Sequence, residues 1–410
     1  MILFFLTSGL FLGWSLGAND ASNVFGTAVG SKMLSFRKAA IIASVAVILG
    51  AVIQGAGASQ TLGKLGSVNA IGGSFTLSLA AAVTVYTMTK FSVPVSSTQA
   101  IVGAIIGWNF FTGNKTDSGT LIKIVSTWIT GPILGAIFSI LLYLLVRWIK
   151  RNANIHLIRF ESFIRTGLII VGAFGAYSLG ANNIANVMGV FVPAFDLQDL
   201  DLGIFSLSSA QQLFLIGGLA IAVGIITYSK RVMETVGSNI IEISADAALV
   251  VVLAHSLVLF IFSSTALSDL LLKAGLPRIP MVPVSSTQVI VGCIVGIGLY
   301  KGVRNINFKL LGEIALGWIT TPVISGLLSF FSLFFMKNIF NIQTGYKNSD
   351  TNSNNAILTT PDESISLIFR YLLIGIIIIG ILAIIFYTLL ERKKTREMRI
   401  SEEKFWKNIK

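Results

Sequence analysis

The sequence predicts an all-α protein that crosses a membrane in about 10–12 segments, and three observations support this fold class. Of 410 residues, 54% are hydrophobic and only 12% are charged, whereas a soluble domain carries about 25% charged residues. The mean hydropathy is +0.82. The charged residues also cluster, so that eleven stretches of at least 19 residues contain no Asp, Glu, Lys or Arg. Because about 20 apolar residues span a bilayer as a helix, these stretches predict a polytopic membrane protein.

The same composition excludes several functional classes. A chain this apolar is neither disordered nor an ordinary soluble enzyme. One cysteine, Cys293, permits no internal disulfide or thiolate metal cluster, and two histidines offer little for a metal site. The net charge of +12 lies mainly in loops, so we expect contact with membrane lipid and not with nucleic acid. Residues 13–17 fit the G-x-S-x-G nucleophile elbow but lie in an apolar helix without a plausible histidine, so we expect no enzyme.

Loop charges predict how the chain is oriented. Segment 147–165 carries five Lys or Arg residues against one acid, and the tail 392–410 carries eight against three. Loop 196–201 instead carries three Asp residues and no basic residue. Because cytoplasmic loops are enriched in Lys and Arg, the path that fits these loops places the N-terminus outside and the C-terminus in the cytoplasm.

Three motifs occur twice in the same order, which indicates an internal duplication. The pairs are GANDASNV at 17–24 with GANNIANV at 180–187, VPVSSTQ at 93–99 with VPVSSTQ at 282–288, and WITGP at 128–132 with WITTP at 318–322. The offset between copies is 163 residues for the GAN motif and 189 for the VPVSSTQ motif. We therefore expect extra residues in the second copy, around 263–281.

The two copies are predicted to face opposite sides of the membrane. The helix with the first GAN motif ends at a basic loop, whereas the helix with the second ends at the acidic loop 196–201. Inverted repeats are common in secondary transporters, whose substrate site lies near the bilayer midplane at the repeat interface. Each copy would contribute a helical hairpin near that midplane, either re-entrant or fully spanning.

This interpretation divides the chain into six parts. They are a first inverted repeat (1–146), a cytoplasmic basic linker (147–165), a second inverted repeat (166–336), a polar extracellular loop (337–365), a C-terminal transmembrane helix (366–391) and a basic cytoplasmic tail (392–410). The polar loop includes KNSDTNSNN at 347–355, a composition typical of an exposed flexible segment.

Each VPVSSTQ motif places polar side chains at a predicted helix start. Pro94 and Pro283 disfavour helix before them and suit the first turn of the helix that follows. Free backbone N–H groups and the positive end of the helix dipole attract anions there. One such motif would most simply be a helix cap, but two at matched positions favour an anion site built from Ser96, Ser97, Thr98, Gln99, Ser285, Ser286, Thr287 and Gln288.

The GAN motifs supply oxygen ligands inside apolar helices. They contain one carboxylate and five amides: Asp20, Asn19, Asn23, Asn182, Asn183 and Asn186. An ionisable residue within the membrane is costly and is functional by default. Oxygen ligands without His or Cys indicate a hard cation such as Na⁺. The alternative for the asparagines is hydrogen bonding between helices.

Four other residues carry weaker signals. Glu242 and Asp246 are expected at the membrane interface, with a functional role as the alternative. His255, within a hydrophobic run, is interpreted as a packing residue, and Cys293 is expected only to pack.

These motifs resemble the signature of the inorganic phosphate transporter (PiT) family over residues 9–335. The resemblance implies symport of inorganic phosphate with Na⁺, or with H⁺ in some bacterial members, by a homodimer. It implies that phosphate is bound by the eight Ser, Thr and Gln residues above and cations near Asp20, Asn23, Asn183 and Asn186. Many relatives carry Asp where this chain has Asn183, and His where it has Gln99 and Gln288. Neither amide titrates, which favours Na⁺ over H⁺.

The resulting hypothesis is a Na⁺-coupled phosphate symporter of the plasma membrane that works by alternating access, with Na⁺ as coupling ion and no further cofactor. The charge balance supports coupling, because an anion entering against a negative interior is opposed by about 2.3 kcal/mol per charge per 100 mV. The alternatives are an H⁺-coupled phosphate, metal-phosphate or sulfate permease on the same scaffold, a passive anion channel, and an intramembrane hydrolase.

Overall fold

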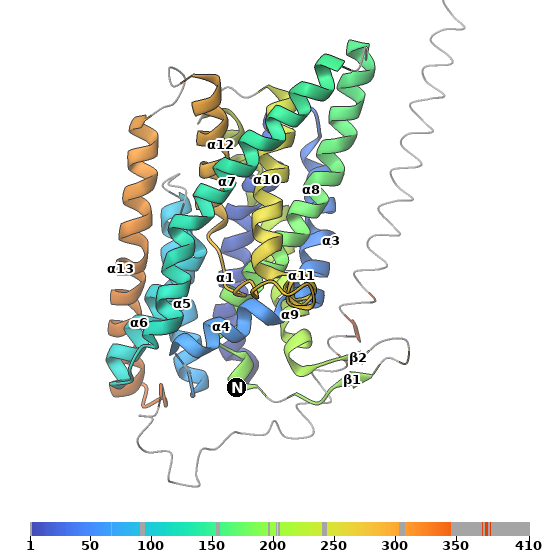
Figure 1. The fold of residues 1–410 in the computed structure, drawn as a ribbon. Helices are drawn as coiled ribbons and strands as arrows, with labels where there is room; N and C mark the ends of the chain where they lie inside the picture. The colour runs from blue at the N-terminus through green and yellow to red at the C-terminus, as the bar shows by residue number, and fades with distance from the viewer. Residues whose placement is uncertain are drawn as a thin grey trace, which may run out of the picture.

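The protein is an almost entirely helical bundle in the computed structural model (Figure 1). The structure describes residues 2–66, 68–90, 95–152, 156–195, 197–201, 203, 206–239, 244–302 and 308–345, together with 371, 374, 375 and 378. The C-terminal tail (392–410) and almost all of the predicted C-terminal helix (366–391) fall outside these residues, as does most of the polar loop (337–365). Predictions about those parts therefore stay predictions.

Seven helices come from the first copy of the repeat. They are α1 (Ile2–Asp20), α2 (Ser22–Gly30), α3 (Phe36–Gln54), α4 (Ala56–Gly66), α5 (Ile71–Lys90), α6 (Ser97–Thr112) and α7 (Ser118–Asn152). The second copy supplies α8 (Leu157–Met188), the 3₁₀ turn η1 (Val192–Ala194), α9 (Ser209–Asn239), α10 (Ala245–Ser263), α11 (Thr265–Lys273), α12 (Ser286–Lys301) and α13 (Phe308–Asn338). Two strands, β1 (Leu200–Asp201) and β2 (Ser206–Leu207), form a small antiparallel ladder that the all-α prediction did not include.

Within the described residues, seven helices are long and apolar enough to cross a membrane: α3, α5, α7, α8, α9, α10 and α13. This confirms the polytopic all-α fold class. The prediction of about 10–12 segments counted each hairpin arm as a segment, but α6 and α12 have only 16 residues each. At 1.5 Å per residue, such a helix reaches about 24 Å and falls short of a bilayer core of about 30 Å.

Helices of the two copies contact one another in matched pairs. The contact of α1 with α9 corresponds to the contact of α8 with α3, and the contact of α1 with α5 corresponds to that of α8 with α10. The short helix α6 packs on α5 and α13, and its counterpart α12 packs in the same way on α10 and α7. The duplication in the sequence is therefore repeated in the packing, and each copy is completed by helices of the other.

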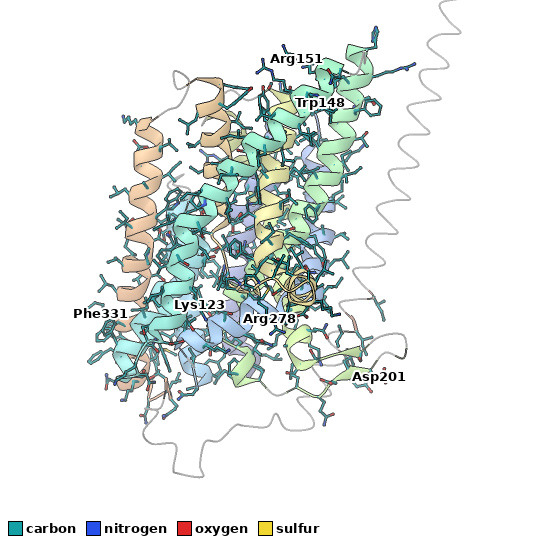
Figure 2. All side chains as sticks on the ribbon, viewed as in Figure 1. Lys123, Trp148, Arg151, Asp201, Arg278 and Phe331 are labelled. Atoms are coloured by element: carbon teal, nitrogen blue, oxygen red, sulfur yellow. The ribbon has the colours of Figure 1, made fainter. Side chains whose placement is uncertain are left out.

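The corresponding helices α7 and α13 run in opposite directions along the bundle (Figure 1). α7 runs from the end near Lys123 to the end with Trp148 and Arg151, whereas α13 begins beside the end of α12 and runs the other way (Figures 1 and 2). Arg151 and Asp201 lie at opposite ends of the molecule, and the N-terminus lies at the Asp201 end. The basic and acidic loops are thus separated as the loop charges predict.

Several boundaries differ from the sequence-based interpretation. α7 continues to Asn152 and α8 begins at Leu157, so helix extends well into the predicted basic linker 147–165. The extra residues expected around 263–281 are found there, because α11 and the following loop separate α10 from α12. The first GAN motif is interrupted at Ala21, between α1 and α2, whereas the second continues through α8.

Glycines allow the short helices to approach the long ones closely. A Cβ atom added at Gly103 of α6 would lie 2.1 Å from the carbonyl oxygen of Pro322 in α13. The matching glycine of α12, Gly292, would place a Cβ 2.2 Å from the carbonyl oxygen of Pro132 in α7. Small residues at helix contacts permit such backbone approach in membranes. The repeated WIT-x-P motif therefore marks the surface on which each short helix rests.

We predict that Gly103→Ala and Gly292→Ala each lower the melting temperature of the purified protein in detergent. An added methyl group must displace the facing backbone, and overpacking of this kind costs about 1–3 kcal/mol. Gly312→Ala is the matched control, because an added Cβ there meets nothing within 4 Å. Equal melting temperatures for all three variants would contradict the close approach.

Candidate functional site

The two hydroxyl-rich segments begin helices α6 and α12. Ser96 has extended backbone angles, and its hydroxyl accepts a hydrogen bond from the backbone N–H of Gln99 at 3.2 Å. Ser285 caps α12 in the same way, accepting from the N–H of Gln288 at 3.3 Å. A serine at this position stabilises a helix start by satisfying a free N–H group. The predicted N-cap and first-turn positions are therefore confirmed, although Pro94 lies outside the described residues.

The two helix starts contact each other directly. The Thr98 hydroxyl donates to the carbonyl oxygen of Val284 at 3.4 Å, and the Thr287 hydroxyl donates to the carbonyl oxygen of Val95 at 3.0 Å. These bonds are equivalent under the repeat, since Thr98 matches Thr287 and Val95 matches Val284. The segments expected to converge do meet, with their N-terminal ends side by side.

Asparagines of the GAN motifs hold these segments in place. The Asn19 amide donates to the carbonyl oxygen of Val95 at 3.2 Å. Its counterpart Asn182 accepts from the N–H of Val284 at 3.1 Å and donates to the carbonyl oxygen of Val282 at 3.5 Å. The chain just before α6 and α12 is non-helical, so its backbone groups need such partners inside a membrane. The asparagines at these two positions therefore have a structural role.

Two further asparagines reach across to the other copy. The Asn23 amide, on α2, donates to the hydroxyl of Ser286 at 3.0 Å. The Asn186 amide, on α8, donates to the hydroxyl of Thr98 at 2.9 Å and to the side-chain oxygen of Asn183 at 3.2 Å. Each GAN motif thus contacts the hydroxyl segment of the opposite copy.

Asp20 lies where these contacts meet. Its carboxylate accepts hydrogen bonds from Asn19 at 2.8 Å, Ser97 at 3.3 Å and Asn183 at 3.3 Å. All three donors are neutral. The two ion pairs found among the described residues, Lys150–Asp246 and Arg278–Asp269, do not involve Asp20. A buried carboxylate without a cationic partner is costly, which makes this position suitable for a bound cation.

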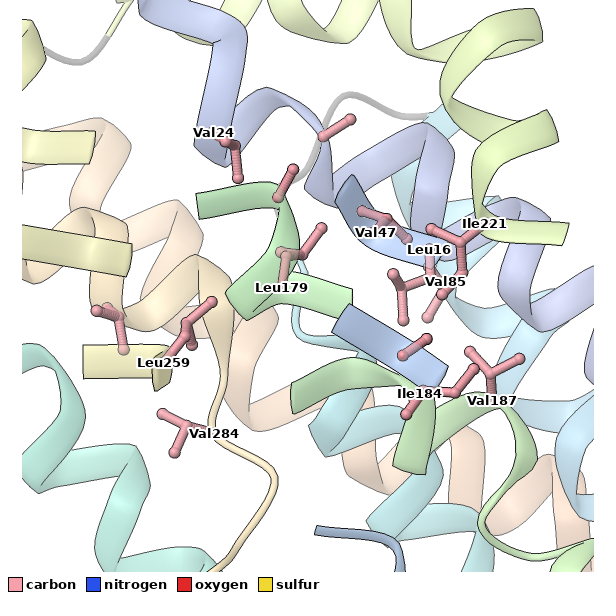
Figure 3. Packing of buried hydrophobic residues seen from close by; sticks show 14 of the residues in the cluster. Leu16, Val24, Val47, Val85, Leu179, Ile184, Val187, Ile221, Leu259 and Val284 are labelled. Carbon is pink, nitrogen blue, oxygen red and sulfur yellow. The ribbon is translucent and has the colours of Figure 1, made fainter. Parts of the chain in front are cut away.

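All fourteen predicted site residues are buried together, each at most 4% exposed. The buried hydrophobic core includes residues next to and within both GAN motifs: Leu16 and Val24 of the first copy, and Leu179, Ile184 and Val187 of the second (Figure 3). Apolar surroundings strengthen the electrostatic interactions of the polar groups that they enclose. The site therefore lies within protein and not at the lipid-facing surface.

Among the site residues, three buried amide oxygens have no hydrogen-bond partner in the described part of the chain. They are Oε1 of Gln99, Oε1 of Gln288 and Oδ1 of Asn186. The two glutamines occupy matched positions in the first turns of α6 and α12. Unpaired buried acceptors are unfavourable, so these oxygens are suited to a ligand that brings its own donor group or a cation.

Two of the four weaker candidates, Asp246 and Cys293, lie outside this site. Asp246 forms an ion pair with Lys150 at 3.7 Å, which agrees with the expected interfacial position, and Glu242 lies outside the described residues. Cys293 is buried in α12. No cluster of three or more His, Cys, Asp or Glu side chains that could hold a metal occurs among the described residues.

His255 has a polar contact that the sequence interpretation did not include. It is fully buried in α10, and its Nε2 atom lies 2.9 Å from the hydroxyl of Ser286, a predicted site residue. The interpretation as a packing residue rested on the hydrophobic run around it. The signal that could have identified it is its ionisable side chain inside a membrane segment, which usually marks function.

Residues 16–329 match the phosphate transporter family. This segment includes every residue of the site described above. The chain belongs to the phosphate transporter family. This transporter is accordingly not an enzyme, and the G-x-S-x-G stretch at 13–17 lies wholly within helix α1 and not at a strand-to-helix turn.

Relatives resemble this transporter over most of their length. A protein of Thermococcus kodakarensis named as a candidate phosphate permease is 26% identical, covering 80% of this chain and 96% of the relative. A similarly named protein of Methanocaldococcus jannaschii is 28% identical, covering 79% and 94%. A solved structure described as the sodium-dependent phosphate transporter is 22% identical with a TM-score of 0.65, covering 82% of this chain and 99% of its own. That likeness shows a shared fold.

We predict that Thr98→Val and Thr287→Val each weaken phosphate transport. Valine keeps the shape but removes the hydroxyl that donates to the carbonyl oxygen of Val284 or Val95, a loss of about 1–3 kcal/mol or roughly a 5- to 150-fold rise in the phosphate KM. The uptake of labelled phosphate into proteoliposomes measures this KM. Thr320→Val is the control, since Thr320 is partly buried on α13 and the hydrogen bonds that the structure describes for its hydroxyl stay within that helix. Wild-type kinetics in both site variants would place the substrate elsewhere.

Proposed function

We propose that this protein is a Na⁺-coupled symporter of inorganic phosphate in the plasma membrane. The observation that supports it most directly is the hydrogen bond between the hydroxyl of Ser97 and the carboxylate of Asp20. Ser97 belongs to the segment proposed to bind phosphate, and Asp20 is the carboxylate proposed to bind Na⁺. Binding of a ligand to Ser97 would therefore alter the hydrogen bonding of Asp20, and binding of a ligand to Asp20 would alter that of Ser97.

The phosphate would be bound where α6 and α12 begin. Two helix N-termini that meet offer free N–H groups and the positive ends of two dipoles to one oxyanion. The side chains proposed to assist are Ser96, Ser97, Thr98, Gln99, Ser285, Ser286, Thr287 and Gln288. All of these groups are neutral, so binding is electrostatically weaker than to Arg or Lys, and an anion held this way can also be released.

The Na⁺ would be bound beside Asp20 by oxygen atoms of the GAN motifs. The proposed ligands are Asp20, Asn23, Asn183 and Asn186, with Asn19 and Asn182 close by. Carboxylate and amide oxygens are ligands that a hard cation prefers. The unpartnered Oδ1 of Asn186 is available in this arrangement. Because the position opposite Asp20 is Asn183, only one carboxylate there can titrate, which favours Na⁺ over H⁺. A protein of the same fold is named sodium-dependent.

Charge balance explains why coupling to Na⁺ would favour the entry of phosphate. A monovalent phosphate that enters against a membrane potential of 100 mV is opposed by about 2.3 kcal/mol, and two accompanying Na⁺ reverse the sign. In an inverted repeat, alternating access follows from one repeat moving against the other around a fixed site. The opposite directions of α7 and α13 support this arrangement. The end with Arg151 would face the cytoplasm, and the resemblance to the family implies a homodimer.

We predict that phosphate uptake into proteoliposomes requires an inward Na⁺ gradient and stops when K⁺ replaces Na⁺. A pH gradient imposed without Na⁺ should drive no uptake. Asp20→Asn should abolish the Na⁺ dependence, because it removes the one carboxylate among the proposed ligands. Asp246→Asn is the control, since Asp246 pairs with Lys150 away from the site. Uptake driven by protons and indifferent to Na⁺ would instead identify an H⁺-coupled permease.

We also predict discrimination against sulfate. Phosphate carries a donor hydroxyl at neutral pH and sulfate does not, so the Oε1 atoms of Gln99 and Gln288 have a partner only in phosphate. A site built to accept such a hydrogen bond rejects the analogue lacking it, here by about 100-fold or more. Competition of sulfate with labelled phosphate measures this. Gln288→Met should weaken phosphate binding and reduce the difference between the affinities for phosphate and sulfate. Equal inhibition by both anions in the wild type would show that the glutamines do not select phosphate.

A further inference from the structure

The contact between α10 and α12 places His255 beside the proposed phosphate site. Its Nε2 atom lies 2.9 Å from the hydroxyl oxygen of Ser286, the first residue of α12. Its Nδ1 atom is buried and has no hydrogen-bond partner in the described part of the chain. The ring therefore makes one polar contact, and that contact is to a predicted phosphate ligand.

The hydroxyl of Ser286 has a second polar neighbour. The amide of Asn23 donates to the same oxygen at 3.0 Å. A serine hydroxyl can accept two hydrogen bonds and donate one. The role of the Ser286 proton therefore depends on whether His255 donates to this oxygen or accepts from it.

The surroundings of the ring select the donating form. No carboxylate pairs with His255 among the ion pairs of the described residues, and a lone buried charge is costly, so the neutral ring is favoured. If Nδ1 carried the proton, a buried N–H would have no acceptor, which is rarer and more costly than an unpaired acceptor. With the proton on Nε2, His255 donates to Ser286. Both acceptor positions of Ser286 are then filled.

The matched serine of the first copy is placed differently. Ser97 occupies the position in α6 that Ser286 occupies in α12, and its hydroxyl donates to the carboxylate of Asp20. Its proton is therefore committed to Asp20. Ser286, which accepts from both Asn23 and His255, keeps its proton free for a third partner in the site.

We propose that His255 is a positioning residue that holds Ser286 as a hydrogen-bond donor to phosphate. This inference rests on the proposed function, since it requires that phosphate contacts Ser286. The two donors fix the direction of the remaining O–H and polarise it, which strengthens the bond that it makes. The hydroxyls of the two matched serines then donate to different partners, that of Ser97 to the carboxylate of Asp20 and that of Ser286 to the phosphate.

Transport kinetics of three single variants and one double variant test this proposal. Ser286→Ala should raise the phosphate KM by about 10- to 100-fold, because a hydrogen bond to a charged group is lost. His255→Leu should raise it by about 3- to 10-fold with little change in kcat, because the donor remains but is no longer held in place. His255→Gln, whose amide can donate from a similar position, should restore most of the affinity.

The double variant His255→Leu with Ser286→Ala separates positioning from a structural role. If His255 acts through Ser286, its replacement adds nothing to the KM of Ser286→Ala. An additive rise, or a wild-type KM for His255→Leu alone, would overturn the proposal while leaving the phosphate site intact. A wild-type KM for Ser286→Ala would instead overturn the proposed site itself.

The protonation of the ring can be read without transport. The chain has two histidines, His156 and His255, so nitrogen NMR of protein labelled only in histidine yields signals from two rings, each with Nδ1 and Nε2. His156→Gln removes the signals of one ring and assigns the remaining ones to His255. A proton on Nε2 and none on Nδ1 is the expected result for His255 in the folded wild type. A proton on Nδ1 would make Ser286 the donor to His255 and would contradict the proposal, even if His255→Leu fails to fold.

Discussion

The structure depends on one constraint: polar groups buried within a membrane protein must find partners inside the protein. Two short helices begin within the bundle, where their first turns and the non-helical backbone before them are buried. Thr98 and Thr287 satisfy carbonyl groups of the opposite copy, and Asn19 and Asn182 satisfy the backbone beside them. These bonds, within and between the copies, create a polar centre in an apolar bundle. A ligand site can form there because its groups are already held in place.

Repetition of the sequence accounts for much of this arrangement but not for its asymmetry. Asp20 is matched by Asn183, Ser97 bonds to the carboxylate, and Ser286 bonds to Asn23 and His255. The first GAN motif is interrupted at Ala21, whereas the second lies in continuous helix. A site with two identical halves would offer the same chemistry twice. Divergence of the halves instead gives matched residues of the two copies different hydrogen-bond partners.

The sequence was sufficient to predict the membrane fold and the convergence of the polar motifs. Long uncharged stretches mark spanning helices, and a proline followed by Ser-Ser-Thr-Gln marks a helix start, because both signals are local in sequence. The contact of His255 with Ser286 joins residues 31 positions apart across a hairpin, and no local pattern encodes it. The sequence analysis also did not predict the end of α7, because the last two turns of this helix carry charged residues. The short β1–β2 ladder has no hydrophobic pattern from which it could be predicted.

The interlocking of the copies has a consequence for how the chain is made. When the ribosome has completed α6 and α7, the hydroxyl of Thr98 and the carbonyl of Val95 still lack Val284, Asn186 and Thr287, which are translated later. Until then, the start of α6 must be satisfied by water, lipid headgroups or the insertion machinery. The first half is therefore not an independent folding unit. Assembly of the centre is postponed until nearly three hundred residues have left the ribosome, and a truncated chain would expose that centre to lipid.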